Sequence, residues 1–216
     1  MAMMTKKYVL EQIGLKLSEE LKPYGFRFIK SKNHIIKQIK SGFDLIEYRI
    51  IDYTPIFLIE LALAIRLNTV EDIVNRFLGE EIMNPQGKPS TLTSGISFHF
   101  LMDNYSDIKV GNEEELNDVI SEYIIGIKAR GLQYFDEYNN LFNANKLKKE
   151  SILNDTTGMS YMLRNLMQSL VLMKLCNDPD LEVLYPKYLE YYVPISGQEI
   201  AGRKAIVDLF EYLKKM

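Results

Sequence analysis

Apolar residues recur at every fourth position at the start of the chain. They are Val9, Ile13, Leu17 and Leu21. This spacing places them on one side of a helix, so the pattern predicts an amphipathic helix over residues 5–21 with one buried stripe. Thr5 is the candidate N-cap. Pro23 and Gly25 end the helix, because the residue before a proline disfavours helical geometry and glycine permits a tight turn.

After this helix the period of the pattern changes to two. Four segments are rich in β-branched and aromatic residues and are separated by turn-forming residues, which predicts consecutive antiparallel strands. The segments are 26–30, 34–39, 43–53 and 56–67. The last alternates most clearly: large apolar residues occupy the odd positions from Phe57 to Ile65, whereas the even positions include Glu60, two alanines and Arg66. Its two faces therefore have different surroundings.

The middle of the chain mixes helix and strand signals. Residues 68–78 have a helical stripe, with Asn68 or Thr69 as its cap, and a turn-rich stretch over 79–95 follows. The alternation from Ile96 to Phe100 predicts a further strand that carries His99 on its polar face.

Helices are predicted from residue 112, and from Glu150 onward the pattern is helical only. Asn112 precedes three glutamates, Glu113 to Glu115, which suit the positive end of a helix running to about Gly131. Further helices are predicted over 134–147, 159–175, 179–192 and 201–213. We expect an α+β fold: an antiparallel sheet of about five strands covered by helices over residues 1–149, with an all-helical C-terminal extension over 150–216.

Composition narrows the class of protein. Of 216 residues, 47% are apolar and 25% charged, which is enough chain for a real core and excludes a disordered protein. The net charge of −3 excludes a strongly basic nucleic-acid coat. The single cysteine, Cys176, excludes an internal disulfide and a thiolate zinc cluster. With no apolar leader and no apolar run of about 20 residues, we expect a cytoplasmic protein without a membrane span.

Catalytic signatures are not found along the sequence. The chain has no nucleophile elbow, phosphate loop, dinucleotide fingerprint or histidine pair at helical spacing. His34 and His99 are read as surface or structural residues rather than proton shuttles, and Cys176 as an inert packed thiol. The acidic residues of the predicted sheet do not suggest a catalytic pair, because their faces differ; they are Asp44, Glu47, Asp52 and Glu60. We therefore expect no enzyme activity, no cofactor and no metal site.

Two clusters remain as candidate binding surfaces. Residues 22–40 carry six basic residues and no acidic one, so Lys30, Lys32 and Lys37 are candidates for contact with nucleic acid or another anion. The alternative is a solvated strand edge protected by lysines. Tyr185, Tyr188 and Tyr192 share one side of a predicted helix and are candidates for contact with a protein partner. The alternative is packing against a neighbouring helix.

Two short motifs carry a family resemblance. They are Leu21-Lys-Pro-Tyr-Gly-Phe-Arg-Phe after the first helix, and Gly131-Leu-Gln-Tyr-Phe-Asp-Glu-Tyr-Asn-Asn-Leu after the Asn112 helix. With the order of elements, they resemble the bacterial family named domain of unknown function 4304, over roughly residues 5–148. The chain departs from that pattern by lacking tryptophan and by its helical tail. The resemblance implies an α+β domain similar to several bacterial immunity proteins, which bind and silence a toxin, and it supplies no catalytic residues.

We therefore expect a non-enzymatic module that binds a protein partner. If the chain acts as an immunity protein, that partner is a toxin. The alternative is a nucleic-acid or anion binder that uses the basic hairpin of residues 22–40. The oligomeric state is left open by the sequence.

Overall fold

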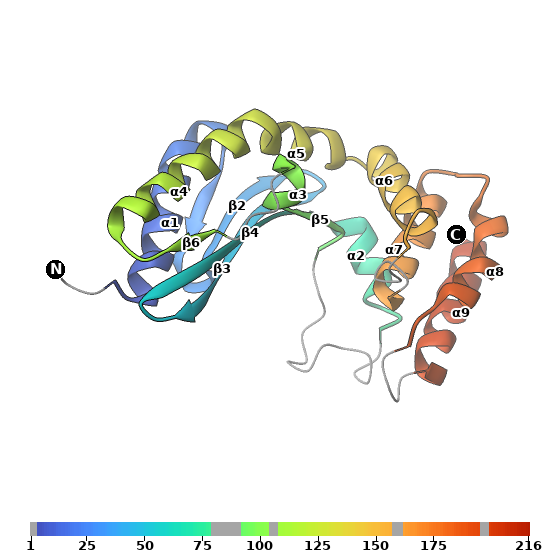
Figure 1. Ribbon diagram of the computed structural model, residues 1–216. Helices are drawn as coiled ribbons and strands as arrows, with labels where there is room; N and C mark the ends of the chain where they lie inside the picture. Colours follow the sequence, from blue (N-terminus) through green and yellow to red (C-terminus); the bar gives the residue numbers. More distant parts are fainter. Residues whose placement is uncertain (1–3, 79–91, 104–107, 157–161, 195–198) are drawn as a thin grey trace. The chain divides into compact units, whose positions relative to one another are not determined.

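The computed structural model describes residues 4–78, 92–103, 108–156, 162–194 and 199–216. The chain divides into two compact units, shown in Figure 1. The first unit comprises Met1–Arg66 and Gly95–Glu137, and the second comprises Leu67–Ser94 and Tyr138–Met216. The sequence predicted an α+β domain over residues 1–149 and a helical extension over 150–216. The second unit instead also includes residues 67–94 and 138–149.

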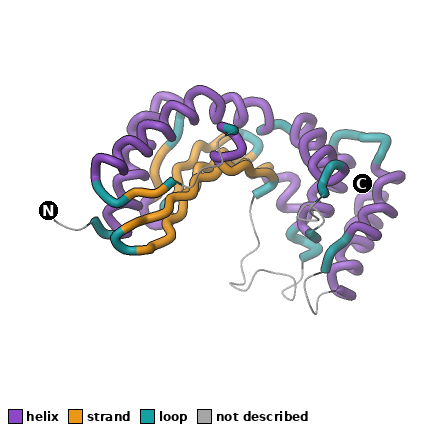
Figure 2. Tube along the Cα trace, in the orientation of Figure 1, coloured by secondary structure: helices purple, strands orange, loops and turns teal. Residues whose placement is uncertain are grey.

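The first unit is built on a six-stranded antiparallel sheet, which confirms the predicted α+β fold. Its strands are β1 (Arg27–Ile29), β2 (His34–Ile39), β3 (Gly42–Tyr53), β4 (Ile56–Leu67), β5 (Ser94–Ser97) and β6 (Lys109–Val110). They follow the order β1-β2-β3-β4-β5, and β6 also pairs with β4, where Phe57 lies opposite Val110. Figure 2 shows the strands in orange.

Helices cover one face of this sheet. Helix α1 (Lys6–Leu21) contacts β1, β2 and β3 as well as α4 (Glu113–Gly126), and Figure 1 shows both helices on the same side of the sheet. The Tyr48 hydroxyl of β3 donates to the Leu10 carbonyl at 2.9 Å, and the Tyr123 hydroxyl of α4 donates to the Ile59 carbonyl at 3.3 Å. The odd-numbered residues of β4 from Phe57 to Ile65 are buried, as the period of two in the sequence predicted.

Several helix boundaries follow from their caps. Thr5 and Asn112 accept hydrogen bonds from the N–H groups of Tyr8 and Glu115, which confirms both predicted N-caps. Helix α4 continues through a π-helical turn, η4 (Ile127–Gly131), into α5 (Leu132–Tyr138). Two short 3-10 turns, η1 (Lys22–Tyr24) and η2 (Lys30–Lys32), flank β1.

Two predictions for the middle of the chain were wrong. The predicted strand over 96–100 ends at Ser97, and α3 (Phe98–Met102) follows, because the Ser97 hydroxyl caps the Phe100 N–H at 3.5 Å. His99 is therefore helical. The helix expected over 68–78 is present as the shorter α2 (Asn68–Val74), but its predicted cap is wrong, because Leu67 is the N-cap residue and supplies no side-chain hydrogen bond. Most of the turn-rich stretch, residues 79–91, lies outside the described residues.

The second unit is helical and centres on α7 (Leu163–Leu175). Helix α7 contacts α2, α6 (Leu141–Leu153), α8 (Leu181–Tyr191) and α9 (Glu199–Lys215). Eight consecutive residues of α7, from 166 to 173, are buried. A helix that is surrounded on every side in this way belongs to the interior of a helical assembly. Across the described segments, no helix combines the length and the apolar character that crossing a bilayer requires.

Candidate functional site

The face of the sheet that is turned away from α1 and α4 carries a hollow in the first unit. Its volume is about 570 Å³. Strand β2 contributes His34, β3 contributes Glu47 and Arg49, and β4 contributes Glu60 and Ala62. His34 and Glu47 lie directly opposite each other in the β2–β3 register. The hollow therefore gathers ionisable side chains from three adjacent strands.

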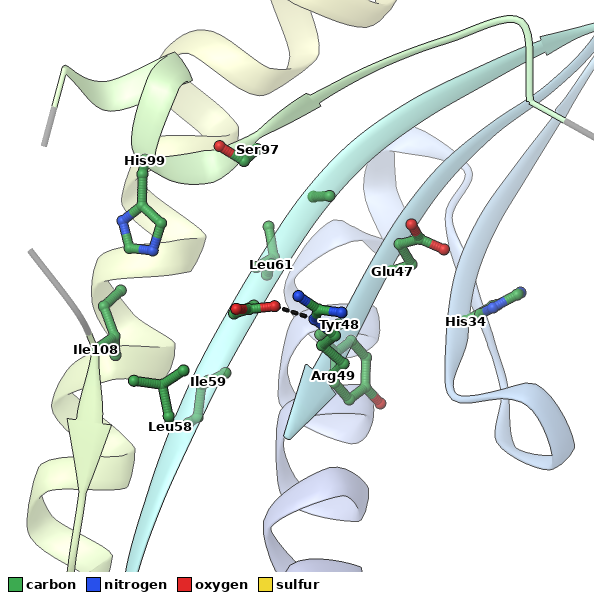
Figure 3. Close-up of a pocket in the computed structure, with 12 residues that line it drawn as sticks. His34, Glu47, Tyr48, Arg49, Leu58, Ile59, Leu61, Ser97, His99 and Ile108 are labelled. Atoms are coloured by element: carbon green, nitrogen blue, oxygen red, sulfur yellow. Dashed lines mark hydrogen bonds and ion pairs between the residues drawn. The ribbon is translucent and has the colours of Figure 1, made fainter. Parts of the chain in front are cut away.

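Segments on the far side of β4 complete the hollow. Ser97, His99 and Ile108 line it from the end of β5, from α3 and from the residue before β6. Figure 3 shows His34 and His99 on opposite sides of the hollow, with Arg49 between them. The apolar side chains of Leu58 and Ala62, at even positions of β4, also contribute to the lining. A partner would thus meet both charged and apolar groups.

One ion pair crosses the hollow from β3 to β4. The Arg49 guanidinium donates through Nε to Glu60 Oε2, and this hydrogen bond raises the pKa of Arg49. The Arg49 side chain is 75% exposed, so the pair is screened by solvent and is worth little to stability. An exposed guanidinium held in one orientation is well suited to contact a partner.

His34, on the β2 side of the hollow, has a lowered pKa, which favours the neutral imidazole. Burial lowers the pKa of His34, the Glu47 carboxylate opposes that effect, and Lys32 adds to it. Adjacent strands lie about 4.8 Å apart, and β3 and β4 separate His34 from the segment of His99, so the two imidazoles are on the order of 10 Å or more apart. They therefore do not converge on one reacting bond. Within the described ranges, no three His, Cys, Asp or Glu side chains are grouped as a metal site requires.

The acidic residues of the sheet divide between its two faces. Glu47 and Glu60 line the hollow, whereas Asp44 is fully buried on the side covered by helices. Asp52 lies at the end of β3, where its carboxylate accepts from the Thr54 N–H at 3.0 Å and its pKa is lowered by hydrogen bonds to Thr54. The expectation that their faces differ is confirmed.

The three candidate lysines are not brought together as one surface. Lys30 pairs with Glu11 of α1. Lys37 lies 3.7 Å from Asp44 and 5.8 Å from the centre of the Phe26 ring, on the side of the sheet covered by helices. Lys32 is exposed in the η2 turn. Two of the three ammonium groups thus face a carboxylate of the fold itself.

The three candidate tyrosines pack within the second unit. Tyr188 is fully buried and its hydroxyl lies 3.0 Å from that of Ser169, while Tyr192 is almost fully buried. Tyr185 stacks on Phe210 of α9, with ring centres 3.6 Å apart. Helix packing, the alternative considered from the sequence, accounts for these contacts, and only Tyr185 retains partial exposure.

The remaining singled-out residues have structural environments. Cys176 ends α7, is half-buried, and has its thiol pKa raised by burial, which disfavours the reactive thiolate. The Glu115 carboxylate accepts from the Gly111 N–H at 2.6 Å and from the Asn112 side-chain amide at 2.7 Å, so it acts at the start of α4 beside the Asn112 cap.

Sequence reasoning missed the hollow as a site. The only signal for it was the small, mixed face of β4, where Glu60 and Ala62 alternate with buried leucines. The pairing of Arg49 with Glu60 depends on the β3–β4 register, which cannot be read from a local sequence pattern. Comparison of the chain with protein-family models, with curated proteins and with solved structures finds no match in any of the three.

Proposed function

We propose that this protein is a non-enzymatic binding module, and that the hollow of the first unit receives a segment of a partner protein. The observation that carries the proposal is the hollow itself, which lies on the sheet face opposite α1 and α4 and combines an exposed guanidinium with apolar side chains. Interfaces between proteins combine an apolar centre with arginine and polar groups in this way.

The toxin-neutralising version of this function rests on the family resemblance of residues 5–148. Immunity proteins act by binding alone, so they need a recognition surface and no convergent catalytic groups. The wide separation of His34 and His99, and the engagement of Glu60 by Arg49, fit recognition better than acid–base chemistry.

Site-specific photocrosslinking in cells tests the proposal. A photoreactive phenylalanine analogue replaces Leu58, an apolar residue that lines the hollow, and, as the matched control, Ser121, an exposed residue of α4 on the other face. We expect one discrete crosslinked protein from position 58 and none from position 121. Ala62→Arg fills the hollow and should abolish the crosslink from position 58.

The same crosslinking experiment tests whether the partner is a toxin. Cells that produce the captured protein should be protected by the wild-type chain, and Ala62→Arg should remove that protection. Crosslinks that are identical at positions 58 and 121, or that persist in Ala62→Arg, would contradict binding at the hollow.

A further inference from the structure

A second pocket of the first unit lies between α1 and the β1–β2 hairpin. Its volume is about 410 Å³, which falls within the roughly 300–1,000 Å³ of small-ligand sites. It is lined by Lys6, Lys7, Leu10 and Glu11 from α1, and by Phe28, Lys30 and Asn33 from the hairpin. Residues about twenty positions apart in the sequence thus meet around one depression.

The floor of this pocket is apolar. Phe28 and Leu10 are both half-buried, so part of each side chain is open to the pocket. The Phe28 ring is seated against Gly14, where an added Cβ would lie 2.3 Å from the ring. A side chain at position 14 would collide with the ring, so the absence of one lets the Phe28 ring pack against α1.

The rim of the pocket is cationic. Three lysines and one glutamate line it, which leaves an excess of two positive charges. Lys30 is paired with Glu11, and this pairing lowers the pKa of Glu11 and keeps it ionised. Lys6 and Lys7 are exposed, and Glu11 is the acidic residue of the lining. Outside the lining, Lys6 also acts on Asp52 and helps to lower the pKa of that carboxylate. Of the three lysines singled out from the sequence, Lys30 lines this pocket with Lys6 and Lys7, whereas Lys32 and Lys37 are not part of its lining.

We propose that this pocket binds a phosphate monoester that carries a small apolar group, of which phenyl phosphate is the simplest aromatic example. A phosphate monoester has a charge of about −1.5 to −2 at pH 7, which matches the excess from Lys6 and Lys7. Its apolar group packs on Phe28 and Leu10. Exposed ion pairs are weak alone, so both halves of the ligand are needed. This site is separate from the hollow and does not depend on it.

Amide NMR shifts of the full chain test the proposal, with phenyl phosphate, inorganic phosphate and phenol titrated separately at low ionic strength. We expect saturable shifts at residues 6–11 and 28–33 with phenyl phosphate, at roughly tenfold lower concentration than with either of the other two. Lys6→Gln with Lys7→Gln should weaken phenyl phosphate binding roughly tenfold.

The matched control is Lys32→Gln with Lys40→Gln, which removes two exposed lysines outside the pocket, one in η2 and one in the turn between β2 and β3. It should change the affinity less than about twofold. The proposal is overturned by the lack of saturable shifts at millimolar phenyl phosphate, by equal affinity for inorganic phosphate, or by an equal loss in the control. All four lysines are exposed, so the variants are expected to keep the wild-type amide spectrum elsewhere.

Discussion

The ammonium group of Lys37 lies 3.7 Å from a carboxylate oxygen of Asp44, directly across the β2–β3 ladder. The Asp44 side chain is 0% exposed, and within the described part of the chain neither oxygen has a partner at hydrogen-bond distance. Burial raises the pKa of Asp44 to about 6, Lys37 opposes that effect, and Asp136 adds to it. The fold therefore holds a carboxylate whose charged form it disfavours.

This relationship predicts an acid-stabilised first unit. The pKa of Asp44 is about 6 in the folded chain and 3.8 in the unfolded chain, so the folded state binds the proton more tightly. Stability should therefore rise as the pH falls from 7 toward 4, and Asp44→Asn should remove this rise. At pH 7.5 the variant should be more stable by about 2 kcal/mol. Hydrogen exchange of β2 and β3 amides across the pH series measures the difference.

Asp118→Asn is the matched control for that series, because Asp118 is an exposed residue of α4. It should leave the pH dependence of the wild-type chain unchanged. If Asp44→Asn kept the wild-type slope between pH 7 and 5, the burial argument would be refuted.

A buried network in the second unit predicts a large loss of stability. The Glu71 carboxylate of α2 is fully buried and accepts from Arg164 at 2.5 Å, from Gln168 at 2.7 Å and from Thr93 at 2.9 Å. Glu71→Ala leaves these donors without their acceptor, so unfolding of the unit should become easier by about 3–5 kcal/mol. Protection of α7 amides against hydrogen exchange reports the loss. Glu182→Ala, at an exposed position of α8, should have little effect.

The pKa of Lys148 provides a second test of the buried network around Glu71. Burial lowers the pKa of its ammonium group to about 8, Glu71 opposes that effect, and Arg164 adds to it. Glu71→Gln should therefore lower the pKa of Lys148 further, because the carboxylate that opposes the effect of burial is neutralised. NMR titration of the isotopically dimethylated lysines, assigned with Lys148→Arg, measures the shift. A pKa that rose or stayed constant would show that Glu71 does not act on this ammonium group.

Local patterns were sufficient to predict most of the elements. The alternation of β4 and the Asn112 cap are properties of a few neighbouring residues, so they were read correctly. Residues 96–100 were misread because Ile96, Phe98 and Phe100 alternate as in a strand, whereas the chain turns into a helix at the Ser97 cap. A cap of one side chain outweighed a period of only five residues.

The sites were predicted less well, because they depend on contacts between distant parts of the chain. Arg49 and Glu60 meet through strand register, and Lys6 meets Phe28 only when α1 packs on the sheet. The tyrosines of α8 were correctly placed on a helix, but periodicity alone does not distinguish a partner surface from the interior of a helical unit.

Substitutions at Tyr188 test whether the tyrosines of this helix stabilise the interior of the second unit. Its hydroxyl lies 3.0 Å from Ser169, and its ring is fully buried. Tyr188→Phe removes only the hydroxyl, so it should destabilise the second unit by about 1 kcal/mol, while Tyr188→Ala leaves a cavity and should cost about 3–5 kcal/mol. Ser169→Ala should match Tyr188→Phe, and the double variant should lose little more than either one, because both remove the same bond. Urea unfolding followed on α7 amides measures all four variants, and fully additive losses would show that the two hydroxyls do not interact.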